Sequence, residues 1–350
     1  MKSNKFVNHK KLEKLISSLF VGAGINPKDA QVVSAELVMT SLRGVDSHGI
    51  RLVPHYLREI LAKRIKSNPK IAFVKTAPAV GILDADHSLG IIAGTAAMDK
   101  AMELGKKTGV AAVAVKNSSH FGAAAIYALR AARRGFISWA FTNTESLVVP
   151  YGGKRPVLGT NPICFAAPCE GEEPICLDMA TSSFAWNKLQ MLKITKSKIP
   201  IGCAVDEQGN LTTSFQMAKF LTPLATYKGY GLGLMVEILS SLLSGAPLGP
   251  ELTPMSPINN KRRKVSHFFM VLDVSAFESP GRFARRMKVL VNMLRRQKPA
   301  KGFKEVLVAG DPEKKILKKR SRVGIPVPAD LLDEFEKMAR ILKIPAKSIL

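Results

Sequence analysis

The stretch VAAVAVKNSSHFG, residues 110–122, decides the class of fold because it joins a buried strand to a polar loop. Its first six residues are all apolar, a pattern typical of a strand that is buried on both faces. Helical patterns flank it, from Ile91 to Lys107 and from about Phe121 to Arg134. VGILDADHSLG before it predicts a strand and turn, and ISWAFT after it predicts a strand. Strands that alternate with helices in this way predict an α/β fold.

Two polar loops follow strands of this pattern, Asn117 to His120 and Thr142 to Glu145. If the strands are parallel, both loops lie at the edge of the sheet where α/β proteins usually bind ligands. His120 is predicted to stand at a helix start, whose positive end disfavours a second proton on the imidazole. A neutral ring can accept a proton or donate a hydrogen bond to a substrate oxygen. The alternative is a histidine that only caps its own helix.

A second candidate segment is RGVDSHGIRLVPHY, residues 43–56. His48 stands between Ser47 and Gly49, and Arg51 follows about one helical turn later. Imidazole titrates near neutrality and guanidinium binds carboxylates through paired hydrogen bonds. This combination suits an enzyme of small oxo or hydroxy acids. The alternative is a helix start whose histidine has only a structural role.

The N-terminal 65 residues are predicted to be helical. Asn26, Pro27 and Asp29 together mark a helix start, with a capping side chain, a proline in the first turn and a carboxylate near the positive helix end. The earlier stretch LISSLFVGAGI resembles a signal peptide, but its apolar spacing favours an amphipathic helix. Residues 229–249 are the only membrane-like stretch, and Glu237 at its centre favours a buried helix.

Two segments are candidates for binding an anion. Lys228 and Gly229 precede small residues that let a helix begin close to a ligand. Thr181 and Ser182 are predicted to lie at the start of the helix that carries Trp186, although from these residues alone an ordinary helix cap is the preferred explanation. The glycine-rich fingerprint of the usual dinucleotide fold is absent, so any dinucleotide must be held by another scaffold.

Composition limits the class of protein. A chain of 350 residues with 46% hydrophobic content can bury a large core, as one domain or two interlocked ones. The four cysteines show no metal-binding spacing and no disulfide framework, so neither a metal site nor disulfides are predicted. Buried thiols in a reducing compartment predict a cytoplasmic protein.

The formal charge of +25 is concentrated in three runs, at residues 261–264, 282–288 and 314–322. A strongly basic surface makes nucleic acid an alternative partner. These runs contain almost no aromatic residues and match no nucleic-acid-binding signature. They are therefore interpreted as solvated helix faces.

Five blocks of the chain resemble, in order and spacing, the malate/L-lactate dehydrogenase-like family of NAD(P)-dependent oxidoreductases. This family includes malate, L-sulfolactate and ureidoglycolate dehydrogenases and 2,3-diketo-L-gulonate reductase. The blocks are RGVDSHGIRLVPHYLREI, KNSSHFGAAAIYALRAARRGFI, VPYGGKRPVLGTNPICFAAP, LDMATSSFAWNKLQ and YKGYGLGLMVEIL, which begin at residues 43, 116, 149, 177 and 227.

The resemblance implies hydride transfer between NAD or NADP and a 2-hydroxy/2-oxo acid in a homodimeric enzyme without a membrane span. It implies a non-Rossmann nicotinamide-binding α/β domain over residues 71–312. Residues 1–70 and 313–350 are expected to form a helical domain together. The alternative function is a basic nucleic-acid-binding protein built on a dehydrogenase-like scaffold.

The resemblance also implies site residues. His48 and His120 match the family's active-site histidines, one of which is the general acid/base, and Asn161 lies in a loop that lines the site. The family's arginine stands four residues after the first histidine, a position that is Leu52 here, so the neighbouring Arg51 is the candidate for the substrate carboxylate. The positions expected to contact the cofactor are Thr144, Asp178, Met179, Ala180, Thr181, Ser182, Lys228, Gly229, Gly310 and Asp311.

Overall fold

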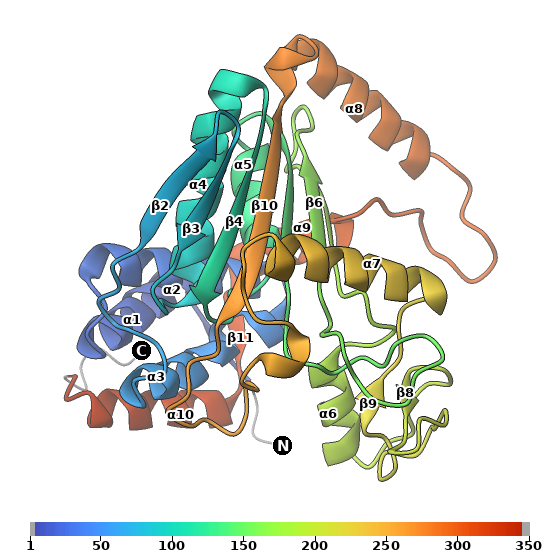
Figure 1. Cartoon of the computed structure of the whole chain (residues 1–350). Helices are drawn as coiled ribbons and strands as arrows, with labels where there is room; N and C mark the ends of the chain where they lie inside the picture. The colour runs from blue at the N-terminus through green and yellow to red at the C-terminus, as the bar shows by residue number, and fades with distance from the viewer. Residues whose placement is uncertain (1–3, 345–350) are drawn as a thin grey trace.

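A seven-stranded mixed sheet forms the centre of the computed structural model, which describes residues 4–344 (Figure 1). The strand order is β2-β3-β4-β10-β5-β6-β7. The strands are β2 (Ala72–Ala77), β3 (Val80–Asp84), β4 (Val110–Ser118), β5 (Phe136–Thr142), β6 (Ile163–Ala167), β7 (Ile175–Met179) and β10 (Val265–Asp273). The predicted α/β class is confirmed.

The sheet is not wholly parallel, because β10 is inserted between two strands of the predicted layer. β3 and β4 are parallel neighbours, whereas β10 runs antiparallel to both β4 and β5. β4 and β5 therefore point the same way without being neighbours. The loops that follow them lie at the same edge of the sheet, as the parallel arrangement predicted.

Helices cover the two faces of the sheet. On one face, α4 (Gly90–Thr108) and α5 (Ala125–Ala132) pack over fully buried side chains such as Val113 and Phe269. On the other, α7 (Tyr227–Glu237) packs Val236 against Ala114, Phe141 and Phe268 (Figure 1). The predicted helix start at Phe121 is wrong: α5 begins four residues later, where Asp178 accepts a hydrogen bond of 2.9 Å from the backbone N–H of Ala125.

The two ends of the chain lie side by side. Strand β1 (Lys5–Val7) pairs antiparallel with β11 (Ile325–Val327). The predicted helix start at Asn26 is confirmed, since its side chain accepts a hydrogen bond of 3.0 Å from the N–H of Asp29. The terminal helices are α1 (His9–Gly22), α2 (Pro27–Leu42), α3 (Val53–Leu61), α9 (Asp311–Val323) and α10 (Ala329–Ile341). Residues 1–3 and 345–350 of the predicted terminal segments lie outside the described residues.

The remaining elements extend from this body. They are α6 (Trp186–Ile194), the short strands β8 (Ala204–Val205) and β9 (Phe220–Leu221), and α8 (Pro280–Arg295), which projects away from the sheet (Figure 1). No helix within residues 4–344 is long and apolar enough to cross a membrane. The prediction of a buried helix over 229–249 is wrong in part, because several apolar side chains of α7 are exposed.

The three basic runs differ in structure. Residues 282–288 lie on α8 and residues 314–322 on α9, where most of their cations are exposed, as predicted. Residues 261–264 instead form an irregular segment before β10. Within it, Arg263 is only 3% exposed, so the interpretation as a solvated helix face is wrong here.

His267 lies at the centre of the sheet, on β10. Its Nδ1 is 2.7 Å from the hydroxyl of Thr142 on β5, and its Nε2 is 2.8 Å from the hydroxyl of Ser118 on β4. The ring is fully buried and stacks on Phe121 at 4.6 Å. Burial lowers the pKa of His267 to about 3, so the folded protein holds a neutral ring that joins three strands.

We predict that His267 makes the fold sensitive to acid. In the unfolded chain, His267 binds a proton near its ordinary pKa of 6.5, whereas in the folded chain it stays neutral at that pH. The folded state is therefore not destabilised by His267 above pH 6.5 and loses stability as the pH falls below it. Between about pH 7 and about pH 4.5, the free energy of unfolding should fall less in His267→Gln than in the parent. The two falls should differ by ~2 kcal/mol. Urea unfolding of both proteins at the two pH values measures the difference, and equal falls would contradict it.

Candidate active site

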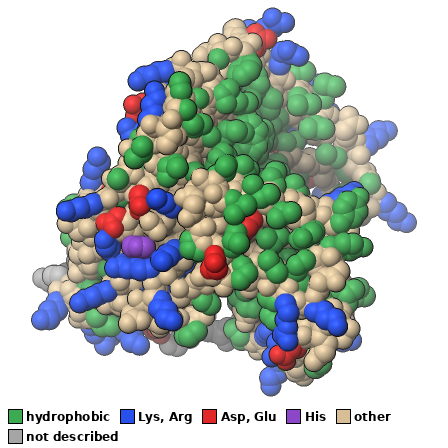
Figure 2. Space-filling view, viewed as in Figure 1, with side chains coloured by type: hydrophobic (Ala, Val, Ile, Leu, Met, Phe, Trp, Pro, Cys, Tyr) green, Lys and Arg blue, Asp and Glu red, His purple; other side chains and the backbone are tan. Residues whose placement is uncertain are grey.

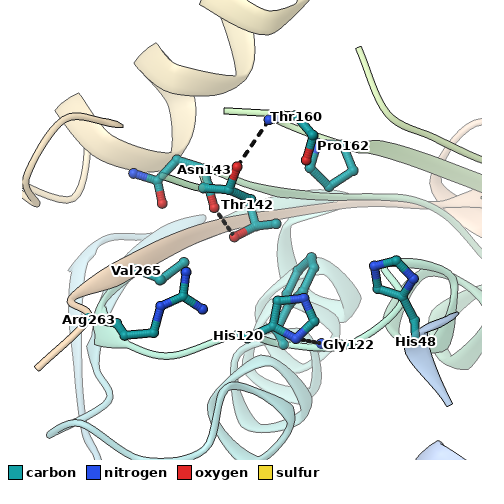
Figure 3. Close-up of a pocket in the computed structure, with 11 residues that line it drawn as sticks. His48, His120, Gly122, Thr142, Asn143, Thr160, Pro162, Arg263 and Val265 are labelled. Atoms are coloured by element: carbon teal, nitrogen blue, oxygen red, sulfur yellow. Dashed lines mark hydrogen bonds between the residues drawn. The ribbon is translucent and has the colours of Figure 1, made fainter. Parts of the chain in front are cut away.

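A small cavity of about 50 Å³ opens at the edge of the sheet where β4 and β5 end. Figure 3 shows His48, His120 and Arg263 along one wall, with Thr142, Asn143, Thr160 and Pro162 opposite them. The cavity is thus formed by the loops after β4 and β5, the segment before β10 and the turn that carries His48. The sequence predicted that the two loops and both histidines would meet, and the structure brings them together.

His120 is held in one orientation by a neighbouring helix. The hydroxyl of Tyr56, on α3, lies 2.6 Å from Nδ1, and the backbone N–H of Gly122 lies 3.4 Å from the same atom. Within residues 4–344, Nε2 has no hydrogen-bond partner. Burial, with smaller contributions from His48 and Arg263, lowers the pKa of His120 well below its ordinary value. The ring is therefore neutral as predicted, although the cause is burial rather than a helix start.

His48 stands next to His120 on a short 3-10 turn, Asp46–His48. The ring centroids are 5.7 Å apart and the planes are inclined by 27°. Ser47 binds Nδ1 at 2.8 Å, and burial lowers the pKa of His48 as well. Gly49 is needed here for packing rather than for contact with a ligand, since a Cβ would lie 2.1 Å from the hydroxyl of Ser41.

The two residues predicted to bind substrate do not line this cavity. The side chain of Arg51 is exposed and is not among the residues that line the cavity. Asn161 is fully buried, and its amide donates to the carbonyl of Gly233 at 3.0 Å and to Glu237 at 2.8 Å. Its oxygen accepts from the N–H of Thr144 at 3.2 Å. The structure thus uses Asn161 to hold the loops behind the cavity.

Arg263 and Tyr56 are the residues of this site that the sequence did not reveal. Arg263 is in an ion pair with Glu145, and its Nε donates to the carbonyl of Thr253 at 3.3 Å. Nothing in the run KRRK distinguishes Arg263 from its exposed neighbours. Tyr56 falls within the quoted histidine segment, eight residues after His48, but its partner comes from a distant loop.

Several predicted cofactor residues form one hydrogen-bonded block beside the cavity. The hydroxyl of Thr144 accepts from the N–H of Thr160 at 3.0 Å. The hydroxyl of Thr181 donates to the carbonyls of Thr160 and Asn161, each at 3.1 Å. Gly229 packs so closely that a Cβ would lie 2.7 Å from the carbonyl of Thr181. The start of α7 is therefore fixed to the wall of the cavity.

A second group lies along β7. Asp178 is exposed and holds the first N–H of α5, and Met179 and Ala180 follow it. Gly310 packs against Cys176, and Arg295 binds both oxygens of Asp311. Asp311 is thus occupied by a protein partner, and Asp178 presents the freer carboxylate.

These residues fit a nicotinamide dinucleotide. Among the described residues Lys228 is an exposed cation without an ion-pair partner, at the positive end of α7, and this arrangement suits a phosphate. The exposed carboxylate of Asp178 suits sugar hydroxyls. The prediction that Thr181 and Ser182 start a helix is wrong: α6 begins at Trp186, and both hydroxyls donate to backbone carbonyls. No cluster of three or more metal-binding side chains lies within residues 4–344.

An oriented imidazole, a buried guanidinium and a helix start with an exposed lysine suit an oxidoreductase of a small acid. Residues 7–336 match the family model for malate/L-lactate dehydrogenase, and the chain belongs to this family. It is an NAD(P)-dependent dehydrogenase of a 2-hydroxy acid, as the sequence predicted. None of these findings supports the nucleic-acid-binding alternative.

Relatives match nearly the whole chain. The malate dehydrogenase of Pyrococcus abyssi is 36% identical over 327 residues, which cover 91% of this chain and 89% of that protein. The NAD(+) ureidoglycolate dehydrogenase of Escherichia coli strain K12 is 32% identical over 325 residues, 93% of each chain. The solved structure of sulfolactate dehydrogenase from Methanocaldococcus jannaschii has a TM-score of 0.92 at 32% identity and covers 99% of both chains.

Proposed function

We propose that His120 is the general acid/base in the reversible oxidation of a 2-hydroxy acid of the malate, lactate, sulfolactate or ureidoglycolate type. The observation that carries this assignment is the pair of contacts at its ring. Tyr56 fixes Nδ1 at 2.6 Å, and Nε2 is left to a ligand in the cavity. A base oriented by a third group in this way is the usual arrangement at a catalytic centre.

The bound nicotinamide supplies the hydride acceptor. During oxidation, Nε2 of His120 accepts the proton of the substrate hydroxyl. This step uses the tautomer in which Nδ1 carries a hydrogen and donates it to the oxygen of Tyr56, and in that tautomer the N–H of Gly122 makes no hydrogen bond to Nδ1. During reduction, the same nitrogen returns the proton to the carbonyl oxygen. Burial and the carboxylate of Glu59 raise the pKa of Tyr56 well above 10, so the phenol stays protonated and orients the ring.

His48 has a supporting role in this proposal. Its ring stacks on His120, and among the side chains of residues 4–344 only the exposed Ser47 makes a hydrogen bond to it. His48 lines the same cavity. Positive charge on His48 would repel positive charge on His120, and His48 therefore contributes to the lowered pKa of His120.

We also propose that the residues predicted from the sequence contact the cofactor. Lys228 and Gly229 would hold the phosphates, and Thr144, Thr181 and Ser182 would form the wall behind them. Asp178, Met179 and Ala180 would contact the sugar and the nicotinamide. Gly310 and Asp311 support β7 from outside. We place this nicotinamide-binding unit in residues 71–312 and the helical unit in 1–70 with 313–350. A cytoplasmic location is part of the same proposal, and the four cysteines are all free thiols in the structure.

A homodimer is also part of the proposal. Exposed apolar side chains run along α7 and the π-helical segment after it, Ile238–Leu242, and Figure 2 shows apolar side chains gathered over this region and the neighbouring strands. A contiguous apolar surface of this kind is typical of a protein interface. A second copy of the chain fits it because this enzyme family is expected to be dimeric. The residues are Leu234, Met235, Ile238, Leu242 and Leu243.

The assignment of His120 predicts a large loss of turnover in His120→Gln. The value of kcat for hydroxy-acid oxidation should fall by about 10²- to 10⁴-fold, while the Kd for reduced cofactor changes less than about threefold. His9→Gln, on α1, is the matched control. Nicotinamide absorbance measures turnover, and fluorescence titration measures cofactor binding. Turnover in His120→Gln within about twofold of the parent would contradict the assignment.

The pH profile gives an independent test. Because the pKa of His120 is lowered, the neutral base persists below the ordinary value of 6.5. In the parent enzyme, kcat/KM for oxidation should therefore stay level as pH falls through 6.5 and decline only below it. An acidic limb with its midpoint above 6.5 would exclude this ring as the base.

A charged substitution in the proposed dimer interface tests the homodimer. Leu242→Glu should convert the protein to a monomer, because a buried unpaired carboxylate is strongly disfavoured at an interface. Leu211→Glu, an exposed apolar position near β8, is the matched control and should remain dimeric. Sedimentation velocity measures both masses, and a parent that sediments as a monomer refutes the dimer.

A further inference from the structure

Arg263 has an unused donor in the wall of the active-site cavity. The residue is 3% exposed, and its Nη1 is buried without a hydrogen-bond partner within residues 4–344. The other two nitrogens are occupied, Nη2 by Glu145 and Nε by the carbonyl of Thr253. A buried charged donor without a partner is strongly disfavoured, and Nη1 is therefore a donor that a ligand in the cavity can use.

The carboxylate that pairs with Arg263 is shared with a neighbouring loop. This carboxylate, of Glu145, also accepts a hydrogen bond of 2.9 Å from the N–H of Met255, so it serves the neighbouring loop as well. Figure 3 shows the guanidinium of Arg263 beside His120. Both side chains line the same cavity. The cavity therefore offers an anion a positive group next to the proposed acid/base.

We propose that Arg263 binds the carboxylate of the substrate through Nη1, next to the hydroxyl or carbonyl group that His120 serves. This inference rests on the proposed role of His120. A 2-oxo acid carries its carboxylate and its carbonyl on adjacent carbon atoms. The adjacent guanidinium and imidazole match that arrangement, and charge-assisted hydrogen bonds to a carboxylate are strong and directional.

Arg263 takes the function that the sequence suggested for Arg51. Arg51 is exposed and outside the cavity, and Leu52, which follows it, carries no charge. The positive charge comes instead from the segment that leads into β10, more than two hundred residues later in the chain. The carboxylate site is thus built from a different part of the fold than the histidines.

Equilibrium binding of a stable 2-oxo acid analogue tests this assignment. The enzyme is saturated with reduced nicotinamide dinucleotide, and oxamate or its neutral ethyl ester is titrated by calorimetry. Arg263→Met should bind oxamate about 100-fold more weakly than the parent, whereas binding of ethyl oxamate changes by less than about threefold. Arg263→Lys, which keeps the charge but not the planar pair of donors, should lose about 10-fold for oxamate alone.

Arg64→Lys is the matched control. Arg64 is equally buried and binds the same loop, through the carbonyls of Pro254, Met255 and Lys261, but it does not line the cavity. Its replacement should lower the melting temperature without changing the ratio of oxamate to ethyl oxamate affinity. Added guanidinium ion should restore part of the oxamate binding to Arg263→Met and none to the control.

The outcomes separate this assignment from that of His120. If Arg263→Met and Arg263→Lys lose affinity for acid and ester equally, or if the parent does not distinguish the two ligands, Arg263 is only a structural residue and the inference fails. If Arg263→Met does not fold, the Arg263→Lys ratio decides. A His120→Gln enzyme that binds oxamate normally and keeps its turnover refutes the proposed function while leaving the carboxylate site intact.

Discussion

The hydrogen bond between Tyr56 and His120 is the contact on which the site depends, because it joins two parts of the chain that fold by separate local rules. Tyr56 lies on α3, in the helical layer formed by both chain ends, and His120 lies in the loop after β4. The contact fixes one ring nitrogen at a part-buried position and leaves the other for chemistry. Burial around it makes the ring neutral, which is the form a base requires.

Insertion of β10 is the second constraint. This strand enters the sheet between β4 and β5 and brings Arg263 to the cavity at its beginning. Two residues into the strand, His267 joins hydroxyls of both neighbours from inside the sheet. The same strand therefore supplies a structural imidazole to the core and a guanidinium to the site. Their different surroundings give these two basic side chains different functions.

The sequence predicted features that depend on local patterns and missed those that depend on distant contacts. The cap at Asn26, the buried strand before His120 and the coming together of His48 and His120 follow from local signals or from the family resemblance. Arg263 could not be recognised, because its burial depends on β10 and on Glu145 from another loop. Arg51 was favoured by its position beside His48, but the turn directs it to solvent.

A crystal structure of the enzyme with reduced nicotinamide dinucleotide and oxamate tests the central claim most directly. The account predicts that the carbonyl oxygen of oxamate lies within hydrogen-bond distance of Nε2 of His120. It also predicts that the carboxylate of oxamate lies on Nη1 of Arg263. A dinucleotide bound away from this cavity, or oxamate held by Arg51 with Nε2 of His120 left free, would contradict it.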